Sequence, residues 1–293
     1  MSTNDRITVL VTGADGFIGR NLVPYLASLN HKVIAASRIA FAFEHPNINA
    51  ARLPDLSAEF DWEPLLQQCD AVVHLAGIAH KFADQNQYDL VNHRATEALA
   101  RAACRFSKHL VFVSSIAAQS GSHSDQGLSE DDIPRPTTTY GRSKLAAEKA
   151  VRAANVSFTI MRPVVIYGSG EKGNFAVIHK MARVPIPLPF GALTARRSVL
   201  SVQNFNSAIA TVLMNPSARG ETFIVSDPLP LTVPDLIARY RMGLGRSPWL
   251  VPIPERWVEL SLKFSGQDEI WQRIGQPLIA RPEKLLALGW QPS

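Results

Sequence analysis

The chain has 293 residues, of which 46% are hydrophobic, so it is long enough for one large domain or two modest ones around a real core. Its formal net charge is +5, but the basic residues are spread along the chain, so we expect no nucleic-acid partner. No apolar run reaches membrane-spanning length and the polar opening has no signal-peptide pattern, so we expect no membrane insertion and a cytoplasmic location. The two cysteines lack metal-ligand spacing, and no metal site is expected.

The first predicted strand covers residues 7–11 and is followed at once by a glycine-rich turn and a helix. Gly13, Gly16 and Gly19 recur at every third position. Glycine is needed where the backbone turns tightly, where a pyrophosphate approaches the main chain and where the helix packs on the strand. The first amide groups of the helix add a positive end for phosphate. Because strand, turn and helix occur together, the stretch predicts a dinucleotide site, with an ordinary strand-to-helix turn as the weaker alternative.

The second predicted strand, at residues 32–38, ends in Ser37 and Arg38. In dinucleotide folds a carboxylate at this strand end accepts a hydrogen bond from the adenosine 2′-hydroxyl, whereas an arginine accommodates a 2′-phosphate. A carboxylate would repel that phosphate, and a guanidinium can bind it with two parallel hydrogen bonds. Arg38 therefore favours NADP(H) over NAD(H), with a solvated surface arginine as the alternative.

Strands and helices continue to alternate along the chain. The next predicted elements are an irregular stretch before Asp55 and Leu56, a short helix at 61–68, and compact strands at 71–77 and 109–115. This alternation indicates an α/β fold, a doubly wound parallel sheet of the Rossmann type with ligands at the carboxyl ends of its strands. Ser114 and Ser115 lie at such an end.

A polar segment at 119–139, rich in Ser, Asp and Pro, is predicted to be a loop that leads into Tyr140 and a helix. Tyr140 and Lys144 share a face of that helix. An ammonium about 4 Å from a phenol, at an effective dielectric of about 20, favours the phenolate by roughly 4 kcal/mol, or about three pKa units, before desolvation is subtracted. That shift would bring the phenol into range as a general acid or base. Taken alone, such a pair is more often an ordinary helix surface.

Several stretches, in this order, resemble the extended short-chain dehydrogenase/reductases, and the branch of nucleotide-sugar epimerases, dehydratases and reductases is the most similar. They are the glycine turn, the His-Leu-Ala-Gly end of the strand at 71–77, the paired serines, and Tyr-Gly-Arg-Ser-Lys at 140–144. The segment at 161–168 looks like the one that passes the nicotinamide in that family, and residues 196–202 are similar to its substrate-side arginine motif. The resemblance covers nearly the whole chain.

The resemblance implies a role for each matched residue. Tyr140 would be the general acid and base, and Lys144 would lower its pKa and hold the nicotinamide ribose. Ser115 would hydrogen-bond the reacting carbonyl or hydroxyl, with Ser114 as the alternative. Asn174 and Arg197 would hold the nucleotide diphosphate of the substrate, although a surface salt bridge is the alternative for Arg197. Contacts to the cofactor would come from Gly13, Asp15, Gly16, Phe17, Ile18, Gly19, Arg38, Asp55, Leu56, Leu75, Ala76, Gly77, Ser114, Tyr140, Lys144, Pro163 and Val165.

Two departures from the family pattern bear on the chemistry. Ile116 and Ala117 follow Ser115, where the dehydratases of the family place acidic residues, so dehydration is not expected. Asn204 stands where an aspartate is usual after the arginine motif, and we expect this position to be mainly structural.

We expect residues 1–168 to form the NAD(P)-binding Rossmann domain, with 198–227 returning to it through a strand at 222–225. Residues 169–197 and 228–293 would form a smaller, interleaved lobe that binds the substrate.

Within that lobe, Pro185, Pro187 and Pro189 predict an extended segment that lines a cleft, and a helix is predicted at 233–242. Three tryptophans would form an apolar cap or dimer surface, or belong to the core: Trp249, Trp257 and Trp271.

The expected function is that of an NADP(H)-dependent oxidoreductase acting at C4 of a nucleotide sugar, most simply the reduction of a UDP-4-keto-6-deoxy-amino sugar. The main alternative is a UDP-hexose or UDP-HexNAc 4-epimerase with tightly bound NAD, because the same residues would oxidise C4 and return the hydride to the other face. A carbonyl reductase for small non-sugar ketones and a non-catalytic NADP(H) sensor are weaker alternatives. The resemblance also implies a homodimer through the helix after Leu90 and the helix that carries Tyr140.

Overall fold

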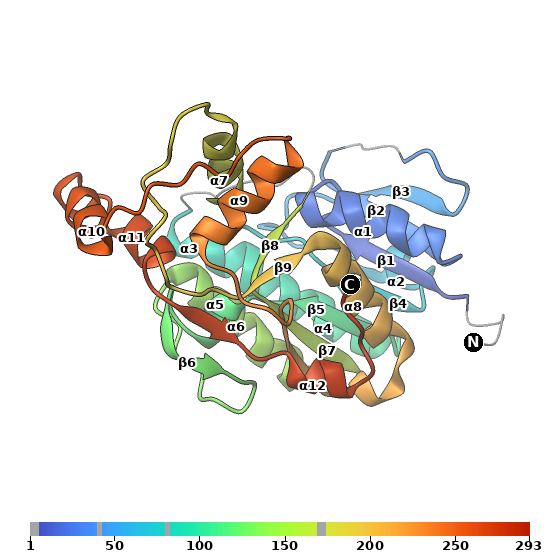
Figure 1. Ribbon diagram of the computed structural model, residues 1–293. Helices are drawn as coiled ribbons and strands as arrows, with labels where there is room; N and C mark the ends of the chain where they lie inside the picture. The colour runs from blue at the N-terminus through green and yellow to red at the C-terminus, as the bar shows by residue number, and fades with distance from the viewer. Residues whose placement is uncertain (1–5, 40–42, 80–82, 169–173) are drawn as a thin grey trace.

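The computed structural model describes residues 6–39, 43–79, 83–168 and 174–293 (Figure 1). Within these ranges, seven parallel strands form a central sheet in the order β10-β7-β5-β4-β1-β2-β3. The strand order reverses between β1 and β4, which is where doubly wound sheets bind their ligands. The prediction of a Rossmann-type sheet is confirmed. The strands are β1 (Thr8–Thr12), β2 (Lys32–Ser37), β3 (Ile48–Arg52), β4 (Ala71–His74), β5 (His109–Val113), β7 (Phe158–Pro163) and β10 (Thr222–Val225).

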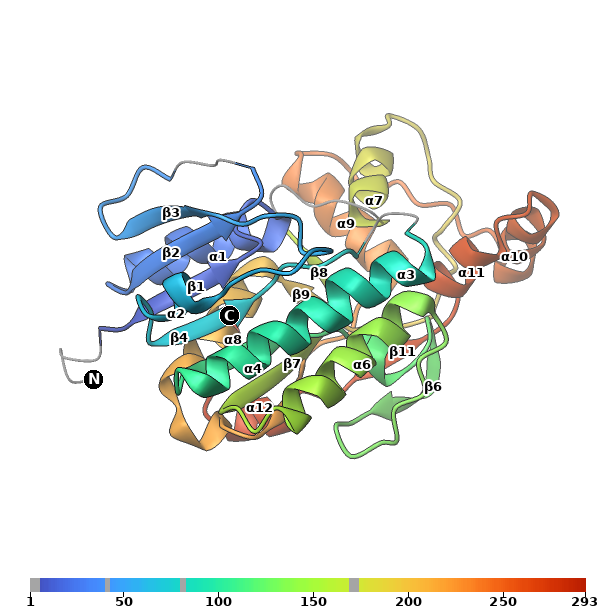
Figure 2. The ribbon, with the colours of Figure 1, turned by 180° about the vertical axis from the view of Figure 1, so that it is seen from behind.

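Helices cover both faces of the sheet. On the face toward the viewer in Figure 1 lie α1 (Phe17–Ser28) and α8 (Val202–Met214), and on the opposite face, seen in Figure 2, lie α4 (Ala95–Arg105) and α6 (Thr139–Ala153). Shorter helical segments connect these layers: α2 (Glu63–Leu66), α3 (Gln85–Tyr88), the π-helical turn η1 (Asp89–Arg94), α5 (Ile116–Gln119), the 3₁₀ turn η2 (Pro216–Ala218) and α12 (Glu283–Ala287).

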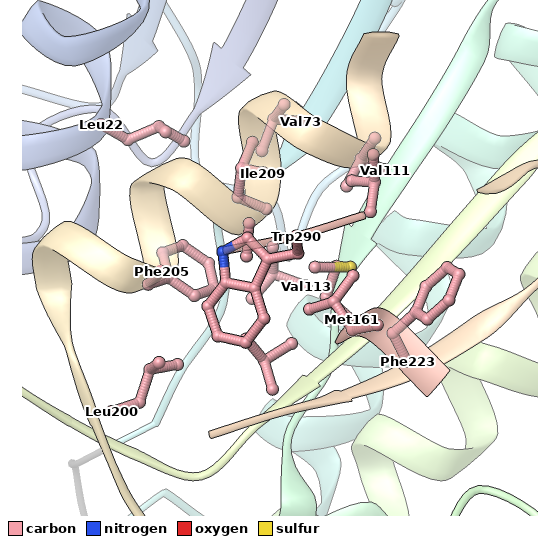
Figure 3. Close-up of a cluster of buried hydrophobic side chains, with 14 of the residues drawn as sticks. Leu22, Val73, Val111, Val113, Met161, Leu200, Phe205, Ile209, Phe223 and Trp290 are labelled. Atoms are coloured by element: carbon pink, nitrogen blue, oxygen red, sulfur yellow. The ribbon is translucent and has the colours of Figure 1, made fainter. Parts of the chain in front are cut away.

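Alternate residues of the strands fill two cores, one on each side of the sheet, as expected for a parallel sheet that is buried on both faces. Leu10 of β1 and Phe112 of β5 face α4 and α6. Val113 and Met161 face the other way and pack around Trp290 with Phe205 and Ile209 (Figure 3). The indole of Trp290 donates a 2.9 Å hydrogen bond to Ser207, so its polar atom is satisfied inside this core.

A smaller lobe lies beside the carboxyl edge of the sheet (Figure 1). It contains α7 (Asn174–Arg183), α9 (Val233–Gly243), α10 (Glu255–Phe264) and α11 (Asp268–Ile274), with β8 (Val165–Tyr167) paired to β9 (Val199–Ser201) at its base. Its own core includes Ile178, Leu193, Leu236, Ile237, Val258 and Trp271. The division of the chain into two functional domains stays a prediction.

Buried Arg241 links α9 to two loops of this lobe through hydrogen bonds. Its guanidinium donates to the main-chain oxygens of Pro248 and Trp249 at 2.8 and 3.2 Å, and to those of Val184 and Ile186 at 3.0 and 2.8 Å. Because a buried cation is costly without partners, this residue holds two loops together around one helix end.

The structure bears out the returning strand at 222–225 and the helix at 233–242, but it corrects two segments. The stretch before Asp55, predicted to be irregular, contains β3 at the sheet edge. The segment at 119–139, predicted to be a loop, contains α5's last residue and β6 (Ser124–Leu128), which pairs with β11 (Leu278–Ala280). β3 is mostly exposed and has little apolar alternation, so its sequence does not indicate a strand. β6 pairs with a strand far along the chain, so the residues around it do not indicate that pairing.

Other features of the smaller lobe follow the expected pattern in part. Leu188, between the prolines, forms a parallel bridge with Leu250, so this segment is extended. Trp271 is buried in the core of the lobe, whereas Trp249 and Trp257 are each 56% exposed. In the part of the chain that the structure describes, no helix has both the length and the apolar character needed to cross a bilayer.

Candidate active site

The glycine turn after β1 has no room for side chains. Gly13 has a φ of +73°, and a Cβ atom there would lie 2.9 Å from the main-chain nitrogen of Ala76. A Cβ at Gly19 would overlap the carbonyl oxygen of Gly13. Helix α1 starts directly after Gly16, and no side chain caps its first amide groups. The turn therefore fits a pyrophosphate, which would meet bare backbone and the positive end of a helix.

Behind this turn, buried His74 on β4 joins β1 to α4. Its Nδ1 lies 2.8 Å from Thr12 Oγ1 and its Nε2 lies 3.1 Å from Thr96 Oγ1. Because the Thr96 hydroxyl donates to the main-chain oxygen of Asn92, we assign the ring proton to Nε2, and Nδ1 accepts from Thr12. Burial, helped by the charge of Lys144, lowers the pKa of His74 to about 3, so the ring is neutral at physiological pH.

The segment that follows β4 lies against the glycine turn. Ala76 donates its main-chain N–H to Thr12 Oγ1 at 3.3 Å, and a Cβ at Gly77 would lie 2.9 Å from Asn92 Oδ1. Leu75, Ala76 and Gly77 therefore lie at the strand switch point, next to Gly13.

Asn92, which the sequence did not suggest, fixes this corner of the site. It lies in the π-helical turn η1 and is 1% exposed. Its amide donates to the main-chain oxygen of Ile78 at 3.0 Å and to Ser143 Oγ at 3.1 Å, and its oxygen accepts from Ile78 at 2.7 Å. Asn92 thus connects the segment after β4 to α6. Such π turns often occur at functional sites.

The carboxyl end of β2 carries a serine and an arginine. Ser37 is buried and donates its hydroxyl to the main-chain oxygen of Ile39 at 2.7 Å, whereas Arg38 is exposed. Asp55 accepts from the main-chain N–H of Ser57 at 2.9 Å. Hydrogen bonds from Ser57, and more weakly the charge of Arg38, lower the pKa of Asp55, so its carboxylate is ionised near neutral pH.

Ser115 and Tyr140 meet at the carboxyl end of β5. The hydroxyl of Ser115 lies near enough to the phenol of Tyr140 to influence its pKa, and it also caps α5 by accepting from Ala117 at 3.1 Å. Thr138 caps α6, which places Tyr140 in the first turn of that helix. Burial raises the pKa of Tyr140 to about 12, and the Ser115 hydroxyl opposes that rise. The phenol therefore carries its proton at neutral pH.

Lys144 lies one turn further along α6, and its Nζ is 4.3 Å from the centre of the Phe112 ring. Burial lowers the pKa of Lys144 to about 7, and the charge of Glu148 works against that fall. In this structure burial raises the pKa of Tyr140, and Lys144 is not among the groups that shift it. The expectation that Lys144 lowers the pKa of Tyr140 therefore stays a prediction.

A buried ion pair lies beneath these residues. Glu148, on α6, binds the guanidinium of Arg162 with both carboxylate oxygens, at 3.0 and 2.5 Å, and accepts a 2.5 Å hydrogen bond from Ser114. Arg162 also donates to Gln119. Of these four residues, only Ser114 was singled out from the sequence. Glu148, Arg162 and Gln119 were not, because their contacts join different elements of the fold.

The remaining predicted contacts lie around the same edge. Asn174 begins α7, but its side chain lies outside the described residues. The other positions predicted to contact the cofactor are Asp15 in the glycine turn, Phe17 and Ile18 in the first turn of α1, buried Leu56 after β3, Pro163 at the end of β7 and Val165 at the start of β8.

Across the part of the chain that is described, no three His, Cys, Asp or Glu side chains are arranged to hold a metal ion.

Arg197 makes main-chain contacts that the sequence did not predict. It donates to the oxygens of Gln276 and Ser122 at 2.6 and 2.8 Å, and to that of Gln272 at 3.4 Å. These bonds link the segment before β6 to α11 and to the residues between α11 and β11. Arg197 therefore stabilises the contact between these segments, whether or not it also binds a ligand.

Asn204 has the structural place expected of it. Its amide donates to Asp227 at 2.7 Å, and its oxygen accepts from the main-chain N–H of Ser293 at 2.9 Å. Asn204 therefore fixes the start of α8 to residues that follow β10.

A parallel sheet in this order, with a bare glycine turn at the switch point and a serine after β5 close to a tyrosine of α6, is the arrangement of a dinucleotide-dependent short-chain dehydrogenase/reductase. Within that class, the chain belongs to the NAD dependent epimerase/dehydratase family, whose profile matches residues 9–226. It is an enzyme of the extended group, whose members include epimerases and reductases of nucleotide sugars.

Individual relatives agree with this assignment. The chain is 31% identical to a UDP-glucose 4-epimerase of Vibrio cholerae, over 100% of this chain and 94% of that protein. It is 28% identical to a 2′-dehydrokanamycin reductase of Streptomyces kanamyceticus, over 92% of this chain and 77% of that protein. The fold is shared with UDP-glucuronic acid 4-epimerase from Bacillus cereus in complex with NAD, at 19% identity and a TM-score of 0.76, over 98% of this chain and 94% of that one.

Proposed function

We propose that the chain is an NADP(H)-dependent oxidoreductase that reduces the C4 ketone of a UDP-4-keto-6-deoxy-amino sugar. The observation that carries the reaction type is the proximity of the Ser115 and Tyr140 hydroxyls at the carboxyl end of the sheet, where α5 and α6 begin. One hydroxyl can polarise a carbonyl oxygen while the other transfers a proton to it.

The direction of the reaction is supported by the charge state of Tyr140. A phenol whose pKa is raised to about 12 is protonated at neutral pH, as a general acid in a reduction must be. Ser115 would donate to the ketone oxygen, and Tyr140 would protonate the oxygen as negative charge develops on it. Bound NADPH would supply the hydride.

The preference for NADP(H) is supported by the end of β2. Arg38 is exposed there, and the place that a ribose-binding carboxylate would take is occupied by Ser37, whose hydroxyl is bound to Ile39. Gly13, Gly16 and Gly19 would hold the pyrophosphate, and Asp55 with Leu56 would hold the adenine.

A 4-epimerase with tightly bound NAD is the second candidate. It is favoured by the name of the Vibrio cholerae relative and by the NAD bound to the Bacillus cereus epimerase. The two functions differ in what happens to the cofactor, because a reductase releases it after each turnover and an epimerase keeps it.

The deciding experiment identifies the nucleotide released by heating the purified protein and titrates the emptied protein with NADPH and NADH. An empty site that prefers NADPH, followed by NADPH oxidation with a UDP-4-keto-6-deoxy-amino sugar, supports the reductase. Retained NAD, with interconversion of UDP-glucose and UDP-galactose, contradicts it and establishes the epimerase.

The homodimer and the cytoplasmic location stay predictions. The exposed faces of α4 and α6, where the family resemblance places a dimer contact, carry Arg101, Arg105, Arg142 and Lys149, and the large exposed hydrophobic residues of the described chain lie elsewhere. Arg101 is paired with Glu97 on α4, so the remaining excess of positive charge is carried by Arg105, Arg142 and Lys149, and a dimer through these helices should weaken at low ionic strength. Light scattering at low and high salt measures this.

A further inference from the structure

The carboxyl ends of two adjacent strands carry arginines, because Arg52 ends β3 and Arg38 directly follows β2. β3 is the outermost strand of the sheet and runs parallel to β2 (Figure 1), and Arg52 pairs in register with Ser37. The next residue, Leu53, donates its main-chain N–H to the oxygen of Ser37 at 2.9 Å, which fixes this register at the strand end. Arg38 and Arg52 are both exposed.

We infer that Arg52 is a second ligand of the adenosine 2′-phosphate, so that this phosphate is held between arginines of two adjacent strands. The inference rests on the proposed use of NADP(H), and it adds a specificity-determining residue from a strand that the sequence did not predict.

Register places the Arg52 side chain correctly for this role. Residues that pair in a parallel sheet project from the same face, so Arg52 leaves the sheet on the side of Ser37, at a strand spacing of about 4.8 Å. Ser37 occupies the strand-end position from which the ribose is recognised. The glycine turn is close to it, because Ala14 donates its main-chain N–H to Ala36 at 3.2 Å.

The charge at this edge suits a phosphate. A phosphate monoester carries a charge of about −1.5 to −2 at pH 7, which one guanidinium balances only in part. Within the described residues, no ion pair occupies the guanidinium of Arg38 or of Arg52. The nearest acid after β3 is Asp55, whose carboxylate is bound to the main chain of Ser57. Arg38 and Arg52 thus supply two cations at this edge, and the carboxylate of Asp55 accepts from the main chain of Ser57.

The test measures binding and needs no sugar substrate. NADPH and NADH are titrated by fluorescence against the wild type, Arg38→Ala, Arg52→Ala and Lys32→Ala. Lys32 is the matched control, because it is an exposed cation at the opposite end of β2. Adenosine 2′,5′-bisphosphate and AMP serve as competing fragments that differ only in the 2′-phosphate.

We expect Arg52→Ala to weaken NADPH and the bisphosphate by about tenfold or more, as loss of a charge-assisted hydrogen bond predicts, and to change NADH and AMP less than about twofold. Arg38→Ala should do the same, and Lys32→Ala should leave both ratios unchanged. Arg52→Gln, which keeps most of the side chain at this strand edge, repeats the test if Arg52→Ala lowers the melting temperature.

Three results would overturn the inference, and they are distinguishable. If Arg38→Ala removes the NADPH preference and Arg52→Ala does not, Arg52 is no ligand but the proposed cofactor stands. If Lys32→Ala acts like Arg52→Ala, the effect is that of general positive charge. If the wild type prefers NADH, the proposed cofactor itself is wrong.

Discussion

Ser114 donates a 2.5 Å hydrogen bond to the buried carboxylate of Glu148. Its neighbour Ser115 caps α5 and lies near the phenol of Tyr140, whose pKa it lowers. Two adjacent serines at one strand end therefore face opposite ways, one toward the ion pair beneath the site and one toward the tyrosine. Because the two serines face different groups, we expect different effects when each is substituted.

Ser115→Ala should lower kcat by about 10²-fold, because a hydrogen-bond donor to the reacting oxygen is lost, and should lower the free energy of unfolding by only about 1 kcal/mol, through loss of the α5 cap. Ser114→Ala should lower the free energy of unfolding by about 1–3 kcal/mol, because a buried carboxylate loses a partner, and should change kcat by less than about tenfold. Steady-state kinetics and urea denaturation of both variants measure this. The reverse pattern would show that Ser114 is the serine that faces the substrate.

Tyr140→Phe should reduce turnover by about 10²-fold to 10⁴-fold while NADPH binding stays within about threefold, because the proton donor is lost and the ring is kept. Tyr25→Phe on α1 is the control and should behave as wild type. A non-catalytic sensor would be indicated if the wild type turns over none of the 4-keto nucleotide sugars and Tyr140→Phe changes no measurable property.

Arg197→Ala should lower the free energy of unfolding by about 2–3 kcal/mol, since three main-chain oxygens lose a charged donor. If Arg197 also binds the diphosphate of the substrate, the KM for the nucleotide sugar should rise at least tenfold. Arg196→Ala, at the exposed neighbouring position, is the control for both measurements. Reduced stability with an unchanged KM would remove the diphosphate role and favour a reductase of small ketones.

Two buried histidines should make the fold sensitive to acid. Burial lowers the pKa of His74 to about 3 and that of His109 to about 4, from 6.5. Between pH 6.5 and about 4 the unfolded chain therefore binds protons that the folded chain does not, and stability falls as the pH falls, by about 1.4 kcal/mol per pH unit for each histidine.

His109→Gln should reduce this slope by about one proton between pH 6.5 and 5, as measured by urea denaturation at each pH. His123→Gln is the control, because His123 is exposed. Equal slopes for His109→Gln and the wild type would mean that His109 is charged in the folded chain.

The parts of the site that depend on neighbouring residues in sequence were predictable. Gly13 follows β1 directly, and Tyr140 and Lys144 lie one turn apart on one helix, so a short window of sequence contains each motif. The alternation of strands and helices likewise identified the doubly wound sheet. The pKa of Tyr140 was not predictable, because burial is decided by what packs around the phenol.

The parts that depend on pairing between distant segments were missed. Arg162 and Glu148 come from β7 and α6, Asn92 works through a π turn that has no sequence signal, and Arg52 lies on an edge strand with mostly exposed residues. Arg197 matched a family motif, but its three main-chain partners come from segments 75 or more residues away. Each of these contacts joins elements whose proximity only the fold creates.

The pairing of β6 with β11 has a consequence for how the chain is made. β6 follows directly on the segment that carries Ser115, yet its partner strand lies about 150 residues later. At ribosomal rates of about 5–20 residues per second, several seconds or more pass between the synthesis of β6 and that of β11, and during this time β6 lacks its partner strand. The small sheet of β6 and β11 can therefore form only after residues 278–280 have been synthesised, and until then the nascent chain has an unpaired strand edge at β6.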